Sequence, residues 1–240
     1  MKIIKAEWEL RNLGVLCQEA EIEAEDSFET IKDEIKKIDA TYVVVKAPVA
    51  RPDIYSCLME HGFSFIEASI RVSYKLKELV CPKLIKRLSD EITYREMNDD
   101  EISIMKQQIG RGMFKTDRVS LDPIFSKEQA ARRYVFWILD EKKRGSKLLN
   151  YIYKDQPVGF SCMKEAKPCV FYPVLGGVYL FEKTLPIGGA IIFKQLEIAK
   201  EMGGKELFTY ISSNNPAVMR SYSQLGYTFE EVKYVFVKHN

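Results

Sequence analysis

The chain has 240 residues, 46% of them hydrophobic and 29% charged, so it is long enough to bury one or two cores. Its 36 basic and 34 acidic residues leave a net charge of +2, which gives no electrostatic reason to expect a nucleic-acid partner. The first twelve residues are too charged for a signal peptide, and no apolar run reaches the roughly 18 residues that span a membrane. We therefore expect a cytoplasmic protein that does not contact a membrane.

Cysteine and histidine are scarce and poorly placed for chemistry. The five cysteines are odd in number and include no Cys-x-x-Cys pair, as is typical of reduced thiols in the cytosol. The two histidines are His61 and His239. A metal site built from histidine and cysteine is therefore not expected, and a hydrolase with a catalytic histidine would have to depend on His61.

The first half of the chain alternates strands and helices. Strands are predicted at 15–22, 41–46 and 65–76. Asp26 with Glu29 is a capping box that predicts a helix after it, and Pro52 begins a second helix that ends at Gly62. Residues 77–91 are charged and contain Pro82. We therefore predict a first domain at 1–80, a connection at 81–91 and a second domain at 92–240.

The second half has a longer series of elements, in the order β-α-α-β-β-β-α-β-α-β. Strands are expected at 92–96, 148–154, 158–164, 177–182, 207–211 and 229–237. Helices are expected after capping boxes at Asn98 and Ser126, at 188–203 and at 216–225. Strands that alternate with helices predict an α/β protein with a mixed sheet.

The sequence also contains a weak internal repeat. Shifted by 164 residues, 43–74 lies on 207–238 without a gap, and four positions are identical. The identical pairs are Pro52 and Pro216, Gly62 and Gly226, Phe65 and Phe229, and Glu67 and Glu231. Either the two halves share one structural unit, or both units merely use proline to begin and glycine to end a helix.

Gly188 and Gly189 mark a candidate phosphate site. They stand where a loop enters a helix, whose first N–H groups are unpaired and attract anions. Glycine there allows a diphosphate to approach the backbone. The alternative is an ordinary turn between a strand and a helix.

A second constellation follows the strand at 207–211. Asn215 precedes a helix, and Tyr222 lies seven residues later, about two helical turns away, so both point to one side. A phenol at that place can give a proton to a leaving thiolate. The alternative is a tyrosine that packs in the core.

These residues resemble the GNAT (GCN5-related) N-acetyltransferase superfamily. That family has a phosphate loop Arg/Gln-x-x-Gly-x-Gly/Ala, which 185–190 (LPIGGA) matches except for Leu185 at the first place. Asn215, Tyr222 and the Gly226-Tyr227 pair match its later signature. The resemblance implies a mixed, mostly antiparallel sheet flanked by helices, preceded by a smaller, truncated GNAT-like α/β domain.

The resemblance also implies acetyl-CoA as the donor and a role for each matching residue. The cofactor-binding positions are Leu180 for the pantetheine arm, Ile187, Gly188, Gly189 and Ala190 for the pyrophosphate, and Asn215 for the CoA arm. Tyr222 would also protonate the thiolate. The loss of the basic residue at Leu185 weakens the expected hold on CoA, and the nearby Lys183 is a candidate to compensate.

A narrower resemblance is to two-domain acetyltransferases that act on dTDP-fucosamine. It is carried by Glu7-Trp8-Glu9, Gly14, Arg118, Asp122, Pro123, Phe125, Tyr134 and Trp137. Arg118 is then a candidate to hold an acceptor phosphate, with a structural ion pair as the alternative. Glu182 is the candidate general base, with an ordinary solvated charge as the alternative.

The sequence therefore predicts transfer of an acetyl group from acetyl-CoA to a primary amine of a small molecule, an amino sugar or nucleotide sugar among the options. A GNAT fold that has lost activity and serves as a binding or scaffold protein is one alternative. A GNAT-like aminoacyl transferase is another, although the near-neutral charge argues against a tRNA surface. We expect a monomer or homodimer.

Overall fold

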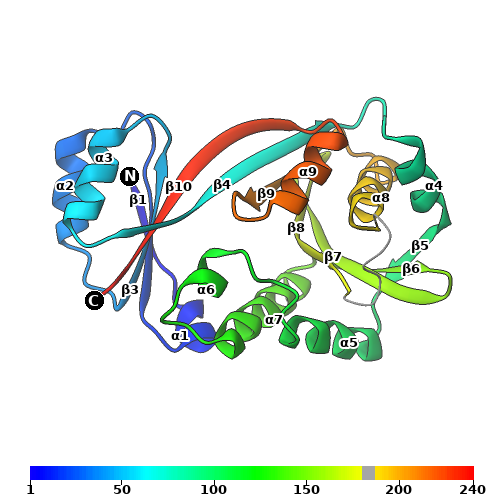
Figure 1. Cartoon of the computed structure of the whole chain (residues 1–240), viewed down its shortest axis with the longest axis horizontal. Coiled ribbons are helices and arrows are strands. Elements are labelled where there is room, and N and C mark those ends of the chain that lie inside the picture. Colours follow the sequence, from blue (N-terminus) through cyan, green and yellow to red (C-terminus); the bar gives the residue numbers. More distant parts are fainter. Residues whose placement is uncertain (180–186) are drawn as a thin grey trace.

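The computed structural model describes residues 1–179 and 187–240, and within them all ten strands form one sheet (Figure 1). The strands are β1 (Lys2–Lys5), β2 (Cys17–Glu21), β3 (Tyr42–Pro48), β4 (Ser64–Lys75), β5 (Ile92–Glu96), β6 (Lys147–Tyr153), β7 (Gln156–Lys167), β8 (Val170–Val178), β9 (Glu206–Ser212) and β10 (Thr228–His239). The helices are α1 (Trp8–Leu13), α2 (Phe28–Lys36), α3 (Pro52–Glu60), α4 (Lys83–Glu91), α5 (Asp99–Gly110), α6 (Arg118–Leu121), α7 (Lys127–Lys143), α8 (Ile187–Glu201) and α9 (Pro216–Gln224). The strand order is β1-β2-β3-β10-β4-β9-β8-β7-β6-β5.

Helix caps confirm most of the predicted helix starts. Asn98 and Ser126 each form a capping box, with Glu101 and Gln129 respectively. The predicted box at Asp26 is wrong, because Ser27 is the N-cap of α2 and accepts from the N–H of Thr30. The element order from residue 92 is as predicted, with the one-turn α6 added.

Two predicted boundaries differ from the structure. The expected connection at 81–91 contains α4, which lies against α8 and buries Ile85 and Leu88 in the same core. Helix α4 has few apolar residues and many charged ones, so its short amphipathic sequence is easily mistaken for a linker. The strand expected at 177–182 begins earlier, at Val170, and its last described residue is Val178.

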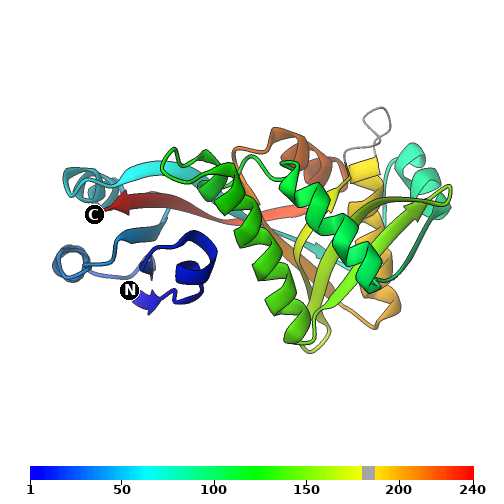
Figure 2. The same ribbon diagram turned by 90° about the horizontal axis from the view of Figure 1, so that it is seen from below.

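The two halves of the chain exchange strands. β4 leaves the amino-terminal half to pair with β9, and β10 leaves the carboxy-terminal half to pair with β3. In Figures 1 and 2, these two long strands cross from the larger body into the smaller one. The sheet is therefore continuous across the predicted boundary between 1–80 and 92–240, and the two-domain division stays a prediction.

The strand exchange has the symmetry of the internal repeat. A shift of 164 residues carries β3, α3 and β4 onto β9, α9 and β10 with the same bounds. The shift also relates the strand pairing. Lys46 of β3 pairs with Val235 of β10, and their repeat counterparts, Tyr210 of β9 and Arg71 of β4, pair in the same way. Between β4 and β10, Phe65 pairs with Phe236, and their repeat counterparts Phe229 and Val72 also pair with each other. The repeat is thus confirmed as a structural one.

Apolar side chains form separate cores on the two faces of the sheet. On the larger body, one core lies under α4, α8 and α9 and another under α5 and α7. In the smaller body, α2 and α3 cover a third core, and α1, α6 and α7 a fourth. Phe236 of β10 packs in the third core, whereas its repeat counterpart Val72 packs in the first. No helix in the described residues is long and apolar enough to cross a bilayer.

Candidate active site

The sheet opens between β8 and β9. These parallel strands pair only at Val170↔Glu206 and Phe171↔Leu207. The next residues of β8 include Pro173, which has no N–H to give to β9, and β8 has a register shift against β7 at the same point. The shift bends β8 away from β9, so the two strands diverge after these two pairs.

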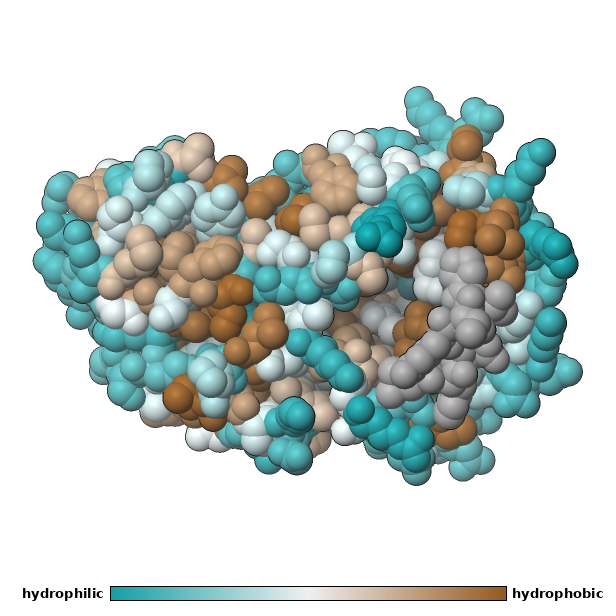
Figure 3. Space-filling view, in the orientation of Figure 1, coloured by the Kyte–Doolittle hydropathy of each residue, from teal (hydrophilic) through white to brown (hydrophobic). Residues whose placement is uncertain are grey.

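A cleft of about 490 Å³ lies at this divergence. It is lined by Ile191 and Val218 from α8 and α9 on one face of the sheet, and by Tyr134 and Trp137 from α7 on the other. Figure 3 shows the surface hollowed in this region, right of the centre of the molecule. The cleft therefore gives access to the slit between β8 and β9 from both faces.

The start of α8 forms part of the cleft wall. Gly188 lines the cleft, whereas Ile187 and Ala190 are fully buried. Gly189 is tightly packed: a Cβ there would lie 3.0 Å from the Cδ1 atom of Ile85 on α4. Of the four predicted pyrophosphate positions, only Gly188 faces the cleft with its own atoms. The others contribute backbone at most, and Gly189 also serves helix packing.

Asn215 and Tyr222 line the same cleft from α9. Asn215 is the N-cap of this helix, and its side-chain oxygen accepts from the N–H of Val218 at 3.1 Å. The Tyr222 ring is 7% exposed and packs edge-on against Tyr227, with ring centroids 4.6 Å apart. Burial raises the pKa of Tyr222, so its phenol is protonated at neutral pH and has a proton to donate.

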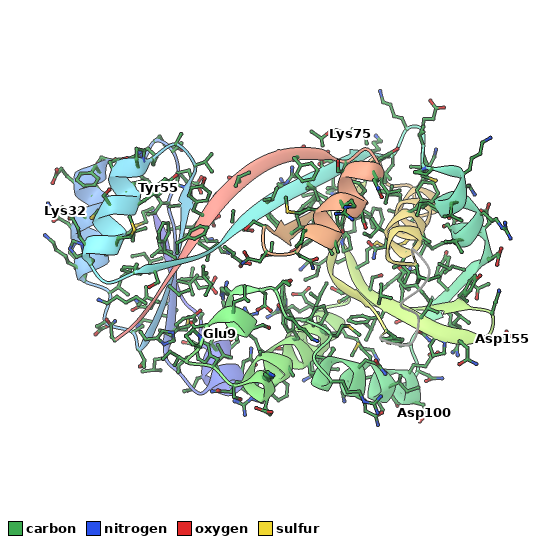
Figure 4. All side chains as sticks on the ribbon, viewed as in Figure 1. Glu9, Lys32, Tyr55, Lys75, Asp100 and Asp155 are labelled. Atoms are coloured by element: carbon green, nitrogen blue, oxygen red, sulfur yellow. The ribbon has the colours of Figure 1, made fainter. Side chains whose placement is uncertain are left out.

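Arg118 also lines the cleft, but its charge is already paired. It contacts Glu19 and lies 3.7 Å from Glu9, a fully buried carboxylate on α1 that also binds Arg133 at 2.7 Å. Burial alone would lower the pKa of Arg118, but the nearby carboxylates raise it well above its ordinary value. Figure 4 labels Glu9 beside α6 and α7. This arrangement is the structural ion pair considered above as the alternative to phosphate binding.

A second cavity of about 250 Å³ adjoins this ion-pair cluster. It shares Arg118, Arg133 and Trp137 with the cleft, and Trp8, which is 42% exposed, forms another wall. Both tryptophans of the chain thus line it. Its charged lining residues are Glu19, Lys46, Arg118, Arg133, Asp140 and Arg144. Cations outnumber carboxylates there.

Leu180 and Glu182 were predicted as site residues, and they lie outside the described residues. Leu185 and Lys183 lie outside them as well. The expected general base is therefore not placed. In the described part of the chain, no group of three or more His, Cys, Asp or Glu side chains could hold a metal ion.

Glu67 is a cleft residue that the sequence reasoning did not assign to the site. It lies on β4, lines the cleft, and its Oε2 atom is buried without a hydrogen-bond partner among the described residues. Burial raises the pKa of Glu67, and Ser212 and Arg118 offset only part of that rise. The available signal was the repeat, in which Glu67 matches Glu231.

Comparison with known proteins agrees with this geometry at the level of the fold. No protein-family model matches the chain, and no curated protein matches it. A conserved protein of unknown function from Staphylococcus epidermidis ATCC 12228 aligns with a TM-score of 0.65 at 14% identity, over 94% of this chain and 85% of that one. A GCN5-related N-acetyltransferase from Sphaerobacter thermophilus aligns with a TM-score of 0.57 at 14% identity, over 88% of this chain and 64% of that one.

A GCN5-related N-acetyltransferase from Kribbella flavida is similar as well, with a TM-score of 0.54 at 13% identity, over 93% of this chain and 81% of that one. The chain spans less than two thirds of the length of the Sphaerobacter protein. These likenesses establish a class by fold: the chain has the α/β GNAT fold, with a mixed central sheet flanked by helices. This confirms the predicted fold class, while the truncated GNAT-like amino-terminal domain stays a prediction.

Proposed function

We propose that this protein transfers an acetyl group from acetyl-CoA to a primary amine of a small molecule by direct attack. The observation that carries the proposal is the slit between β8 and β9, which meets the start of α8 and the Tyr222 phenol in a single cleft. Holding donor and acceptor in one cleft turns a bimolecular reaction into one between positioned groups, which lowers the barrier by several kcal/mol.

The cleft has the chemistry that an acetyl-CoA molecule requires. Past Phe171, β8 has no backbone pairing with β9. Apart from the Pro173 carbonyl, which accepts from the Thr209 hydroxyl at 2.9 Å, the backbone groups on this edge are available to the amides of a pantetheine arm. The first N–H groups of α8, at 187–190, suit a pyrophosphate, and Gly188 leaves room for it. Asn215 and Leu180, the latter outside the described residues, complete the proposed contacts. The bound thioester would supply an activated acetyl group.

Tyr222 is the proposed acid. Its protonated phenol lines the cleft from α9, and a departing thiolate needs one proton. The edge-on contact with Tyr227 holds the ring in one orientation. Glu182, the general base expected from the sequence, lies outside the described residues.

For the acceptor, we propose an amino sugar, free or as a nucleotide sugar. The resemblance to dTDP-fucosamine acetyltransferases supports this, as does the second cavity, where two indole rings suit the face of a sugar. Arg118 lines both cavities and is the proposed substrate-binding residue at the place where they meet. We also propose that the protein acts in the cytoplasm as a monomer or homodimer, without a nucleic-acid partner.

Titration calorimetry with acetyl-CoA, followed by a panel of amines assayed for CoA release, tests the function. We expect a dissociation constant in the micromolar range or tighter, about −8 kcal/mol or better, and CoA release with at least one amino sugar. Absence of acetyl-CoA binding would favour an inactive scaffold protein. Transfer that requires aminoacyl-tRNA would favour the aminoacyl transferase alternative.

A further inference from the structure

We infer that Glu67, which the amino-terminal half contributes on the exchanged strand β4, is the general base that takes a proton from the acceptor amine. The inference rests on the proposed function and adds to it a residue from the other half of the repeat. The acid, Tyr222, belongs to the carboxy-terminal half. The reaction then needs both halves, because each supplies one of the two proton-transfer groups.

The backbone holds Glu67 in place at the cleft. On one side, Glu67 pairs with Val235 of β10. On the other, pairing between β4 and β9 begins at Ser69↔Ser212, so Glu67 lies just past the last residue of β9. Next to it, the N–H of Ala68 donates to the hydroxyl of Ser213 at 2.9 Å. These contacts hold the backbone at Glu67, which follows a register shift between the pairs Phe65↔Phe236 and Glu67↔Val235.

Among the described residues, the carboxylates that line the cleft are Glu67 and Asp117, and Glu67 has one buried oxygen without a hydrogen-bond partner, while the Ser212 side chain and the Arg118 backbone contact its carboxylate. The groups that face it are Arg118 and Asp117 at α6, Tyr134 on α7 and Ser212 on β9. Arg118 is bound by Glu19, and Asp117 accepts from the N–H groups of Val119 and Ser120.

The Oε2 atom of Glu67 is buried without a hydrogen-bond partner in the described part of the chain. A desolvated carboxylate with a free lone pair is a stronger base than one in water.

The proton balance of the reaction is then complete. Glu67 takes one proton from the ammonium form of the acceptor, and the freed nitrogen lone pair attacks the thioester carbonyl carbon. The carbon–sulfur bond breaks with its electron pair on sulfur, and Tyr222 gives the thiolate its proton. The nitrogen loses its second proton to the tyrosinate, which restores Tyr222. Glu67 then releases its proton to solvent, so one proton leaves per turnover.

The test compares Glu67→Gln with the matched control Glu231→Gln. Glu231 is the repeat counterpart on β10, where it lies 3.3 Å from Lys233. In Glu67→Gln we expect kcat to fall about 100-fold or more, with the affinity for acetyl-CoA unchanged by calorimetry. The fall should shrink for acceptors of low basicity, such as hydroxylamine, which need no base at neutral pH. Glu231→Gln should leave all of these values as they are.

Thermal melting separates a base from a structural residue. Because the folded-state pKa of Glu67 is raised, its ionisation lowers stability as the pH rises from the unfolded-state pKa to the folded-state pKa, and the loss is complete above the latter and absent below the former. Glu67→Gln should therefore melt at the same temperature as the wild type or higher at pH 8, with a smaller difference at pH 5. A lower melting temperature at both values would show a structural role and overturn the inference.

The two proposals fail differently. If the wild type is active and Glu67→Gln keeps its turnover and its pH profile, the base is wrong and the transferase stands. If the wild type binds acetyl-CoA but releases no CoA with any amine, the transferase proposal fails and the base fails with it.

Discussion

Tyr222 shows how one side chain combines core packing with chemistry. Its ring is almost fully buried against Tyr227, and it also lines the cleft. The two interpretations of the sequence, a core tyrosine and an acid, are therefore compatible. Spacing from Asn215 predicted the shared side of the helix, since seven residues are about two turns.

Tyr222→Phe keeps the ring and removes the hydroxyl. We expect kcat to fall about 100-fold, because thiolate protonation loses its acid, while the acetyl-CoA dissociation constant changes less than about two-fold. Steady-state kinetics and calorimetry give the two values. Tyr227→Phe is the matched control, since its hydroxyl is buried without a partner among the described residues and does not line the cleft. Unchanged turnover in Tyr222→Phe would remove this phenol from the mechanism.

The partners of Arg118 and the surroundings of Glu67 could not be predicted from the sequence. The partners of Arg118 are Glu9 and Glu19, about one hundred positions away in the chain, and no local pattern links them. Glu67 lies on a strand whose neighbours come from the opposite end of the sequence. Residue type indicated a charge in each case, but only the tertiary structure showed which groups that charge faces.

At the scale of elements, capping boxes and proline or glycine boundaries predicted α3, α5, α7 and α9. Each has a local signal that terminates or begins a helix whatever its tertiary surroundings. The elements that were missed, β1, α1, α4 and α6, have four to nine residues. Packing against other segments stabilises such short elements. β1, α1 and α6 are too short to show a periodic pattern, whereas α4 is amphipathic but was taken for a linker because it is short and highly charged.

The start of α8 yields a paired prediction, because adjacent glycines there have different surroundings. A Cβ on Gly188 meets Val178 at an ordinary 3.5 Å, whereas one on Gly189 meets Ile85 at 3.0 Å. Gly188→Val should weaken acetyl-CoA binding about ten-fold or more with little change in melting temperature, since its side chain points into the cleft.

Gly189→Val should instead lower stability by about 1–3 kcal/mol, because the extra carbons overpack the contact between α8 and α4. Calorimetric titration and thermal melting of both variants check the pair. If Gly188→Val binds acetyl-CoA as the wild type does, the pyrophosphate does not lie at this helix start.

At the scale of the whole molecule, the exchanged strands determine how the two bodies depend on each other. The element order predicted an α/β fold with a mixed sheet, and the motif residues supplied the resemblance to the GNAT superfamily. The continuous sheet could not be predicted, because pairing of β10 with β3 joins residues almost two hundred positions apart. The internal repeat and the resemblance to two-domain acetyltransferases indicated two similar units, but neither shows that the units exchange strands.

This exchange predicts that both bodies unfold together. Phe236 lies on the last strand of the chain, yet its ring packs in the core under α2 and α3 and stacks on Tyr55 at 5.8 Å. Phe236→Ala should lower the free energy of unfolding by about 3–5 kcal/mol, because it leaves a large cavity in the core. Because β10 also holds β4, and β4 holds β9, the loss should reach α8 as well.

Hydrogen exchange with mass spectrometry measures protection in each helix in low urea. In Phe236→Ala, amides of α2, α3 and α8 should lose protection to the same extent, as one cooperative unit does. Met59→Ala is the matched control, since this side chain of α3 is 55% exposed and should leave all three helices protected. Loss confined to α2 and α3 would mean that the smaller body opens alone, with the exchanged strands acting as a tether between independent units.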